Sequence, residues 1–284
     1  MPPQIIDTHV HIWNLEKAKY AWLQGDTTIL NRTYDIDELG QSRVDAHVSE
    51  GIFVQSANNF EDTDWMLQVA RQTGWIKSVV AWLPLLNPAL TYETITNKYK
   101  SNSYIKGIRH LIHNETDASW LLQEPVLESL AMVAQSGLSY DIVGIVPAHI
   151  ETALQLAEKL PDLWMVFDHL NQPPIATKEQ FGKWGELMLA ASKHPNLYCK
   201  ISGLGTASGN LKGWVNDDFE PYVNFVLEHF GTDRCFCGGD WPVSLLAGSY
   251  ERTWHSITSL LEKLLSPAEQ SKVLYGNAKN FYRL

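Results

Sequence analysis

Eight short stretches rich in β-branched and aromatic residues, which are typical of strands, recur along the chain. Most are followed by a longer segment in which apolar residues have the spacing of a helix. They occur at Gln4–His11, Glu50–Ala57, Ser78–Pro84, Ile105–Ile112, Ser139–Ile145, Trp164–His169, Leu197–Ser202 and Arg234–Asp240. Helical spacing of apolar residues marks Glu61–Thr73, Val126–Ser136, Ile150–Lys159, Lys183–Lys193 and Phe219–Phe230. Strands that alternate with helices form right-handed βαβ units and a parallel sheet. Eight such units predict an α/β fold, the closed (β/α)8 TIM barrel, rather than an open doubly wound sheet.

The length of the chain fits one barrel. A (β/α)8 barrel takes about 250 residues plus insertions, and this chain has 284. Because no low-complexity segment, internal repeat or Pro/Gly-rich linker divides the sequence, residues 1–284 are expected to form a single domain.

The end of the chain is expected to be helical. Ser266, Pro267 and Glu269 supply a capping residue, a proline at the first helical position and an acid three residues after the cap. A second short helix is expected from about Asn277. It would carry the aromatic pair Phe281–Tyr282 onto the barrel.

Composition excludes several classes of protein. Hydrophobic residues make up 45% and charged residues 19% of the chain, so a large core can form and global disorder is not expected. The net charge, 22 minus 32 or −10, argues against a nucleic-acid partner, for which basic stripes are typical. Residues 1–12 have no signal pattern and no run of 18 apolar residues exists, so no membrane association is expected.

The cysteines indicate a reducing compartment. Cys199, Cys235 and Cys237 cannot all pair within one chain, and no Cys-x-x-Cys or zinc-finger spacing is present. We therefore expect reduced thiols and a cytoplasmic protein. A homo-oligomer is compatible with the sequence.

Two histidines end the first expected strand, in Asp7-Thr8-His9-Val10-His11. Residues two apart on a strand face the same side, so His9 and His11 are expected to project together into the barrel mouth. Two imidazoles there can hold a metal ion or polarise a carbonyl oxygen. The alternative is a pair of structural histidines bonded to neighbouring polar groups.

An aspartate closes the eighth expected strand, in Gly238-Gly239-Asp240-Trp241-Pro242. The two glycines allow close approach of backbone or ligand, and the proline ends the strand ladder. In a closed barrel the eighth strand pairs with the first, so Asp240 is expected beside His9 and His11. Taken alone, this aspartate would more often cap a helix, but its place on a neighbouring strand end favours a functional site.

Together these motifs resemble the amidohydrolase superfamily, whose members carry D-x-H-x-H on strand one and an aspartate after strand eight. More narrowly, the sequence resembles the sugar-lactonase branch, which contains L-fuconolactonase and L-rhamnonolactonase, with pyrone-dicarboxylate and sulfomuconolactone hydrolases as relatives. The motifs that carry this resemblance are Tyr20–Leu23, Lys106–His110, Phe167–Leu170, Cys199–Leu204, Gly239–Pro242, Gly276–Ala278 and Phe281–Tyr282. The resemblance runs end to end but does not identify the lactone.

The resemblance implies a catalytic role for four residues. His9 and His11 would lie at the lactone carbonyl, and His169 near the leaving ring oxygen or the carbonyl. Asp240 would be the general base that takes a proton from water.

Five more residues are expected to contact the substrate. Arg109 and His110 would face its hydroxyls or carboxylate, since a guanidinium offers a planar fork of donors. Lys200 would line the pocket, or else form a structural ion pair, because a buried lysine is costly unless it is paired. Trp22 and Trp241 could stack on a sugar ring or pack in the core.

The set of possible metal ligands departs from the usual superfamily pattern. Metal-dependent members commonly supply a histidine at the end of strand five, but Ser139–Val143 contains none. His9, His11 and Asp240 could still hold one divalent ion, with zinc as the first choice and water completing the site. The same groups could work without a metal, with the histidines as hydrogen-bond donors. A two-metal site is not expected.

The sequence thus predicts a hydrolase that opens a small lactone, most simply an aldonolactone. The alternatives are a metal-dependent decarboxylase or amide hydrolase of the same superfamily, and a catalytically silent sugar-binding barrel. Retention of Asp240 argues against the silent barrel, because binding needs no general base. The loop Trp13–Asp37 is a candidate lid or substrate wall. Six histidines are expected at the surface or as caps, namely His47, His113, His149, His194, His229 and His255.

Overall fold

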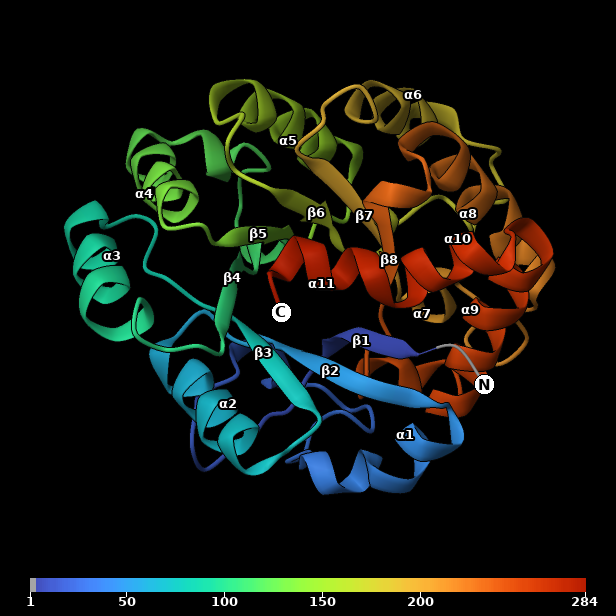
Figure 1. The fold of residues 1–284 in the computed structure, drawn as a ribbon, viewed down its shortest axis with the longest axis horizontal. Helices are drawn as coiled ribbons and strands as arrows, with labels where there is room; N and C mark the ends of the chain where they lie inside the picture. Colours follow the sequence, from blue (N-terminus) through green and yellow to red (C-terminus); the bar gives the residue numbers. More distant parts are fainter. Residues whose placement is uncertain (1–3) are drawn as a thin grey trace.

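The computed structural model describes residues 4–284; residues 1–3 of the predicted domain lie outside the described part. Eight parallel strands form one sheet whose spatial order is the chain order, ringed by helices (Figure 1). The strands are β1 Ile5–Val10, β2 Val48–Val54, β3 Ile76–Ala81, β4 Ile105–His110, β5 Ser139–Ile142, β6 Met165–Phe167, β7 Leu197–Ile201 and β8 Cys235–Cys237. The predicted (β/α)8 barrel is confirmed.

The barrel closes where β1 meets the residues that follow β8. His11 N donates to Trp241 O at 2.7 Å, and Asp240 N donates to His9 O at 2.8 Å. Val10 and Trp241 form an isolated parallel bridge at the same place. This pairing brings the His-x-His motif and the aspartate to one point of the rim, as the sequence predicted from barrel closure.

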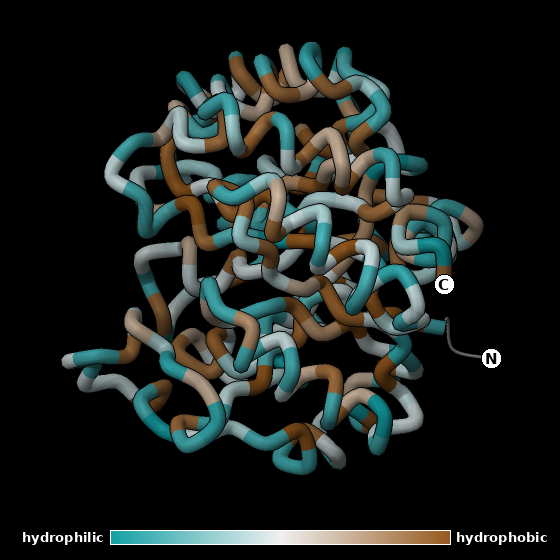
Figure 2. The backbone as a smooth tube through the Cα atoms, turned by 90° about the vertical axis from the view of Figure 1, so that its left-hand side faces the viewer, coloured by the Kyte–Doolittle hydropathy of each residue, from teal (hydrophilic) through white to brown (hydrophobic). Residues whose placement is uncertain are grey.

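The helices cover the outside of the barrel, where apolar and polar residues alternate along their length (Figure 2). Five were predicted: α2 Phe60–Gln72, α4 Glu124–Gln135, α5 Pro147–Lys159, α6 Gly182–Ala191 and α8 Asn216–Phe230. Four were not: α1 Gly40–Asp45, α3 Pro88–Thr94, α7 Leu204–Ala207 and α9 Tyr250–Leu264. None of the helices in residues 4–284 has the length and apolar character needed to cross a membrane.

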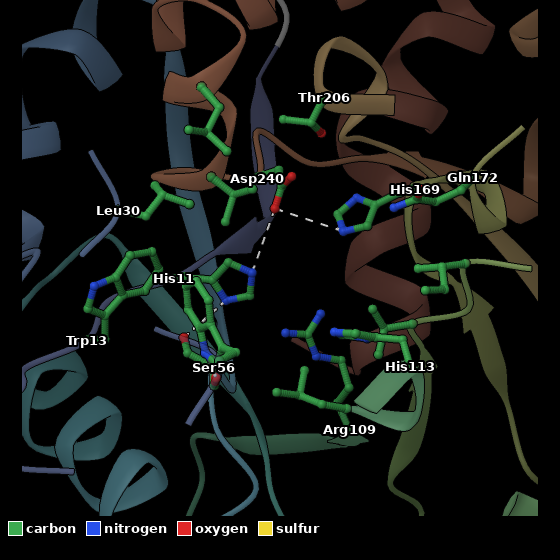
Figure 3. Close-up of a pocket in the computed structure, with 16 residues that line it drawn as sticks. His11, Trp13, Leu30, Ser56, Arg109, His113, His169, Gln172, Thr206 and Asp240 are labelled. Atoms are coloured by element: carbon green, nitrogen blue, oxygen red, sulfur yellow. Dashed lines mark hydrogen bonds and ion pairs between the residues drawn. The ribbon is translucent and has the colours of Figure 1, made fainter. Parts of the chain in front are cut away.

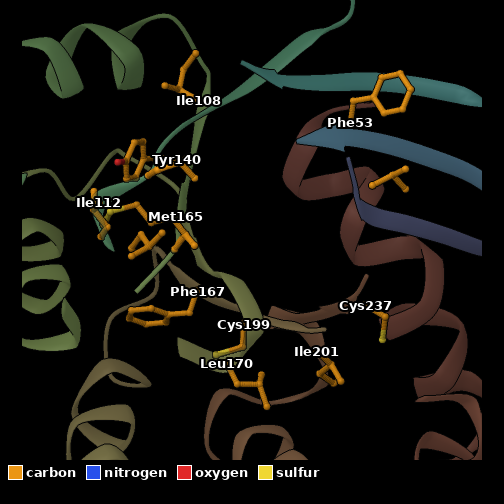
Figure 4. Close-up of a cluster of buried hydrophobic side chains, with 14 of the residues drawn as sticks. Phe53, Ile108, Ile112, Tyr140, Met165, Phe167, Leu170, Cys199, Ile201 and Cys237 are labelled. Carbon is orange, nitrogen blue, oxygen red and sulfur yellow. The ribbon is translucent and has the colours of Figure 1, made fainter. Parts of the chain in front are cut away.

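The core has two layers. The larger one lies between the strands and the helices, and Figure 4 shows part of it, with side chains such as Ile108, Phe167 and Ile201 from β4, β6 and β7. All three cysteines are buried and free, consistent with a packing role. The smaller layer fills the barrel and includes Ile6 and Phe236. Parallel strands buried on both faces produce the short apolar runs seen in the sequence.

The C-terminal helices close the amino-terminal end of the barrel. α10 Pro267–Ser271 begins with the predicted cap, since Ser266 N donates to Glu269 Oε2 at 2.9 Å. After a π-helical turn, α11 Asn277–Tyr282 lies across the strands (Figure 1). Its final aromatic pair packs inside the barrel with the smaller core layer.

Candidate active site

A cavity of about 330 Å³ opens at the carboxyl ends of the strands. Its polar lining includes His11, Arg109, His169 and Asp240 (Figure 3). Apolar side chains form most of the remaining wall: Trp13, Trp22, Leu30, Leu111, Val143, Ile145, Val243 and Leu246. Its size and mixed lining are typical of small-molecule sites.

Three imidazole nitrogens surround one carboxylate oxygen. Asp240 Oδ1 lies 3.8 Å from His9 Nε2, 3.7 Å from His11 Nε2 and 3.9 Å from His169 Nε2. The structure therefore brings together the four residues to which the sequence assigned catalysis.

His11 directly follows β1, but His169 and Asp240 lie further beyond the ends of strands that are shorter than predicted. β6 ends at Phe167 and β8 at Cys237, so His169 and Asp240 lie on the following turns rather than on strand ends. Both have left-handed backbone conformations, with φ of 54° and 56°. Such a conformation costs a non-glycine residue about 1–3 kcal/mol and often occurs at functional sites. Here it turns both side chains toward the cavity.

Asp7 fixes the junction between β1 and the β8 turn. Its Oδ1 accepts hydrogen bonds from His9 N at 2.9 Å and Gly239 N at 2.8 Å. Its Oδ2 accepts from Tyr250 Oη at 2.7 Å. A Cβ on Gly239 would meet Asp7 Oδ2 at 2.5 Å, and one on Gly238 would meet the His9 Cβ at 2.6 Å, so this close approach requires glycine.

The tautomers of His9 and His11 follow from their neighbours. His11 Nδ1 lies 2.7 Å from Val54 O, which can only accept, so Nδ1 carries the proton. Arg109 Nη1 donates to His9 Nε2 at 3.2 Å, so the His9 proton lies on Nδ1, facing Asp168 Oδ1 at 3.4 Å. Burial holds the pKa of both imidazoles well below the ordinary value, so both are neutral. Both Nε2 atoms therefore carry a lone pair and lie within 4 Å of Asp240 Oδ1, and that of His9 also accepts from Arg109.

These three groups fit one metal ion. The ligand atoms of His9, His11 and Asp240 all lie within 4.8 Å of one another, and all three residues are buried. Each Nδ1–H is held by a carbonyl or a carboxylate, the usual support for a metal-binding imidazole. The donor role for these histidines, which the metal-free alternative required, does not fit these tautomers. Burial raises the pKa of Asp240 well above the ordinary value, and a bound cation would favour its carboxylate form.

Asp168 is a site residue to which the sequence analysis gave no role. Its Oδ2 accepts from Arg109 Nη1 at 2.9 Å, and its Oδ1 lies 2.7 Å from Lys200 Nζ. Burial works against the charge, but Lys200, His9 and Arg109 hold the pKa of Asp168 well below the ordinary value. The sequence did contain a signal for it: Lys200 and Arg109 were both expected at the site, and two buried cations need carboxylates as partners.

Three expected substrate contacts lie outside the cavity lining. Lys200 is fully buried beneath the cavity and forms ion pairs, the second of its two predicted roles. His110 follows Arg109 on β4 and so faces the opposite side; it stacks on Trp120 with ring centroids 4.1 Å apart. Trp241 is buried and packs edge-on against Tyr34.

The remaining predictions concern the cavity wall. Trp22 lines the cavity, and its Nε1 donates to Ser56 O at 2.7 Å. With Trp13 and Leu30 it makes the loop Trp13–Asp37 part of the cavity wall.

The structure assigns a position to two of the six histidines that were expected at the surface or as caps. The prediction of a surface or capping role is wrong for His113, because a 3₁₀ turn carries it into the cavity wall, next to Arg109 in Figure 3. His149 does cap α5, since its Nδ1 accepts from Ile145 N at 3.1 Å.

A (β/α)8 barrel with this buried cluster on β1 and after β8 is the architecture of a metal-site barrel hydrolase. The chain belongs to the amidohydrolase family, whose model, described as Amidohydrolase, matches residues 6–284. It is 31% identical to an L-fucono-1,5-lactonase of Burkholderia ambifaria, over 98% of this chain and 95% of the relative. A second L-fucono-1,5-lactonase, from Burkholderia multivorans, is 27% identical over 98% and 96%. A solved amidohydrolase of Burkholderia multivorans with bound zinc superposes with a TM-score of 0.91 at 26% identity, covering 99% of both chains.

Proposed function

We propose that this hydrolase opens a neutral sugar lactone of the L-fucono-1,5-lactone or L-rhamnonolactone class to the hydroxy acid. The observation that carries the proposal is the placement of Asp240 Oδ1 within 4 Å of three imidazole nitrogens at the cavity on the carboxyl ends of the strands. Full-length similarity to two L-fucono-1,5-lactonases supports the lactone as the substrate class. Binding alone would not need a buried carboxylate at this point.

The charges of the cavity favour a neutral substrate. Arg109 is the only lysine or arginine lining it within residues 4–284, and its guanidinium is already paired with Asp168. A lactone that carries two carboxylates would have only this one guanidinium, already shared with Asp168, as a counter-charge, and an unpaired buried charge is costly. The aromatic and aliphatic wall suits the apolar face of a sugar ring.

Asp240 acts on water. Its carboxylate orients a water molecule and accepts a proton as the water oxygen bonds to the lactone carbonyl carbon. Burial raises the pKa of Asp240, which strengthens the ionised form as a base. A divalent ion held by His9, His11 and Asp240 would supply Lewis-acid polarisation of the oxygen that binds it.

The remaining groups stabilise the oxyanion and help to protonate the leaving ring oxygen. Arg109, fixed by Asp168 and Gln55, presents its guanidinium at the cavity floor, where it stabilises negative charge on the former carbonyl oxygen. The carbonyl carbon's bond to the ring oxygen then breaks. The proton taken up by Asp240 passes to that ring oxygen, and His169, 3.9 Å from Asp240, lies close enough to assist.

A panel of lactones tests the proposal. Acid release at near-neutral pH, corrected for spontaneous opening, is expected for L-fucono-1,5-lactone or L-rhamnonolactone. The dianion 2-pyrone-4,6-dicarboxylate is expected to give a kcat/KM at least about 100-fold lower, because its carboxylates would be buried without partners. Faster turnover of the dianion would overturn the charge argument. Hydrolysis of amides or loss of CO₂ from acids, with every lactone inert, would instead favour the amide-hydrolase or decarboxylase alternative.

Removal of metal is expected to lower turnover. Because both Nε2 lone pairs face Asp240, we expect dialysis against a chelator to reduce kcat by at least about 10-fold and one equivalent of zinc to restore it. The measurement pairs lactone turnover with metal content. Full activity in protein shown to contain no metal would establish the metal-free alternative, and would leave the lactonase proposal in place.

A further inference from the structure

A continuous chain of buried polar contacts joins the C-terminal helix to the active site. The Tyr282 hydroxyl donates to Asp141 Oδ2 at 2.7 Å, and Lys200 Nζ donates to the same oxygen at 2.7 Å. Lys200 Nζ also lies 2.7 Å from Asp168 Oδ1. That oxygen in turn faces His9 Nδ1 at 3.4 Å. All five residues are fully buried.

The hydroxyl of Tyr282 is not needed to fill space. Its ring belongs to the apolar layer inside the barrel, together with Phe281, Phe236 and Ile6. A phenylalanine would occupy nearly the same volume, yet this position holds a tyrosine whose hydroxyl bonds a carboxylate. α11, which lies across the barrel in Figure 1, thus closes it and, through Tyr282, contributes one polar contact to its interior.

The contact matters because Lys200 has a third neighbour. Its Nζ lies 3.3 Å from His9 Nδ1, close enough to donate to that nitrogen. If it did, the His9 proton would move to Nε2, and the lone pair that faces Asp240 would be lost. The two carboxylates draw the ammonium group away from His9 and leave Asp168 Oδ1 as the acceptor for Nδ1–H. Tyr282 fixes the Asp141 carboxylate in that position.

We propose that Tyr282 is a positioning residue for the active site: by holding Asp141, it keeps Lys200 between two carboxylates and keeps His9 in the tautomer that presents Nε2 to Asp240. The C-terminal residues of the chain therefore set the state of a catalytic side chain at the other end of the barrel. Of the measurements that test this inference, only kcat and KM rest on the proposed lactonase activity; the His9 tautomer and the zinc affinity do not.

The test compares Tyr282→Phe with Tyr275→Phe. Tyr275 lies in the preceding turn, and among the residues described its hydroxyl has one hydrogen bond, from the Lys279 ammonium at 3.4 Å, so the control makes the same chemical change away from the chain of contacts. Nitrogen NMR of ¹⁵N-histidine-labelled protein is expected to show the Nδ1–H form of His9 in the wild type and in the control. In Tyr282→Phe the Nε2–H form should become populated. Zinc affinity and kcat should each fall by about 10-fold or less with KM nearly unchanged, since losing a direct partner costs about 10–100-fold.

A double-mutant cycle shows whether the effect passes through Asp141. Asp141→Asn and Tyr282→Phe should be non-additive, because they act on one contact chain. A Tyr282→Phe protein with the wild-type His9 tautomer, zinc affinity and kcat, even if less heat-stable, would assign the hydroxyl a purely structural role and overturn the inference. If the wild type opens no lactone, the proposed function fails, and the His9 tautomer still decides this inference.

Discussion

Replacement of Asp240 by asparagine is expected to lower kcat for the best lactone by about 10²–10⁴-fold, the usual contribution of a general base. The amide keeps the shape of the side chain but cannot take a proton from water. Its Oδ1 can still accept hydrogen bonds, so substrate affinity should change much less. Asp162→Asn makes the same change on an exposed residue and should leave kcat unaltered.

Steady-state kinetics and a direct binding measurement separate the two effects in Asp240→Asn. The rate must be compared with spontaneous opening of the same lactone. If the wild type and Asp240→Asn both open every lactone no faster than the spontaneous rate, Asp240 is not the base, and the decarboxylase or the silent sugar-binding barrel is favoured. Zinc content must be measured alongside, because Asp240 is also one of the three metal-fitting groups.

The barrel could be predicted from sequence because each strand is buried on both faces and so appears as a short apolar run. β1 shows this, since all six residues of Ile5–Val10 are buried. The strand ends were less accurate. Polar residues such as His169 and Asp240 continue the strand-like pattern, but the backbone turns to a left-handed conformation there, which residue type does not reveal. α9, Tyr250–Leu264, was missed although it is amphipathic and capped by Ser249.

The site was predictable to the extent that barrel topology determines it. Closure alone brings His9, His11 and Asp240 together. The partners of Lys200 could not be predicted, because Asp141 and Asp168 come from β5 and the turn after β6, and their meeting depends on strand register and barrel radius. The tautomers of His9 and His11 could not be predicted for the same reason. They are determined by contacts such as that of His11 with Val54 O, which have no sequence signature.

Lys200 is expected to be the residue whose removal most destabilises the fold. Its Nζ lies 2.7 Å from carboxylate oxygens of both Asp141 and Asp168, and no part of these three side chains is exposed. Lys200→Met keeps the length and apolar stem of the side chain but leaves two buried carboxylates with Arg109 as the remaining nearby cation. Breaking a buried ion pair by removing one partner costs about 3–5 kcal/mol. We therefore expect the free energy of unfolding in urea to fall by about that amount.

The matched control is Lys263→Met, which removes a lysine from an exposed pair with Glu220. Surface pairs contribute about 0–1 kcal/mol, so this variant should unfold close to the wild-type midpoint. The pH dependence gives a second check. In Lys200→Met the ammonium group that lowered the pKa values of Asp141 and Asp168 is gone, and burial still raises them. Both pKa values should therefore rise, and both carboxyl groups should take up protons at a higher pH than in the wild type. The loss of stability should therefore shrink as the pH falls, because protonation removes the unpaired charge in the variant while it weakens the ion pairs of the wild type. A midpoint shift equal to that of Lys263→Met at every pH would mean that the buried pairs contribute no more than surface pairs.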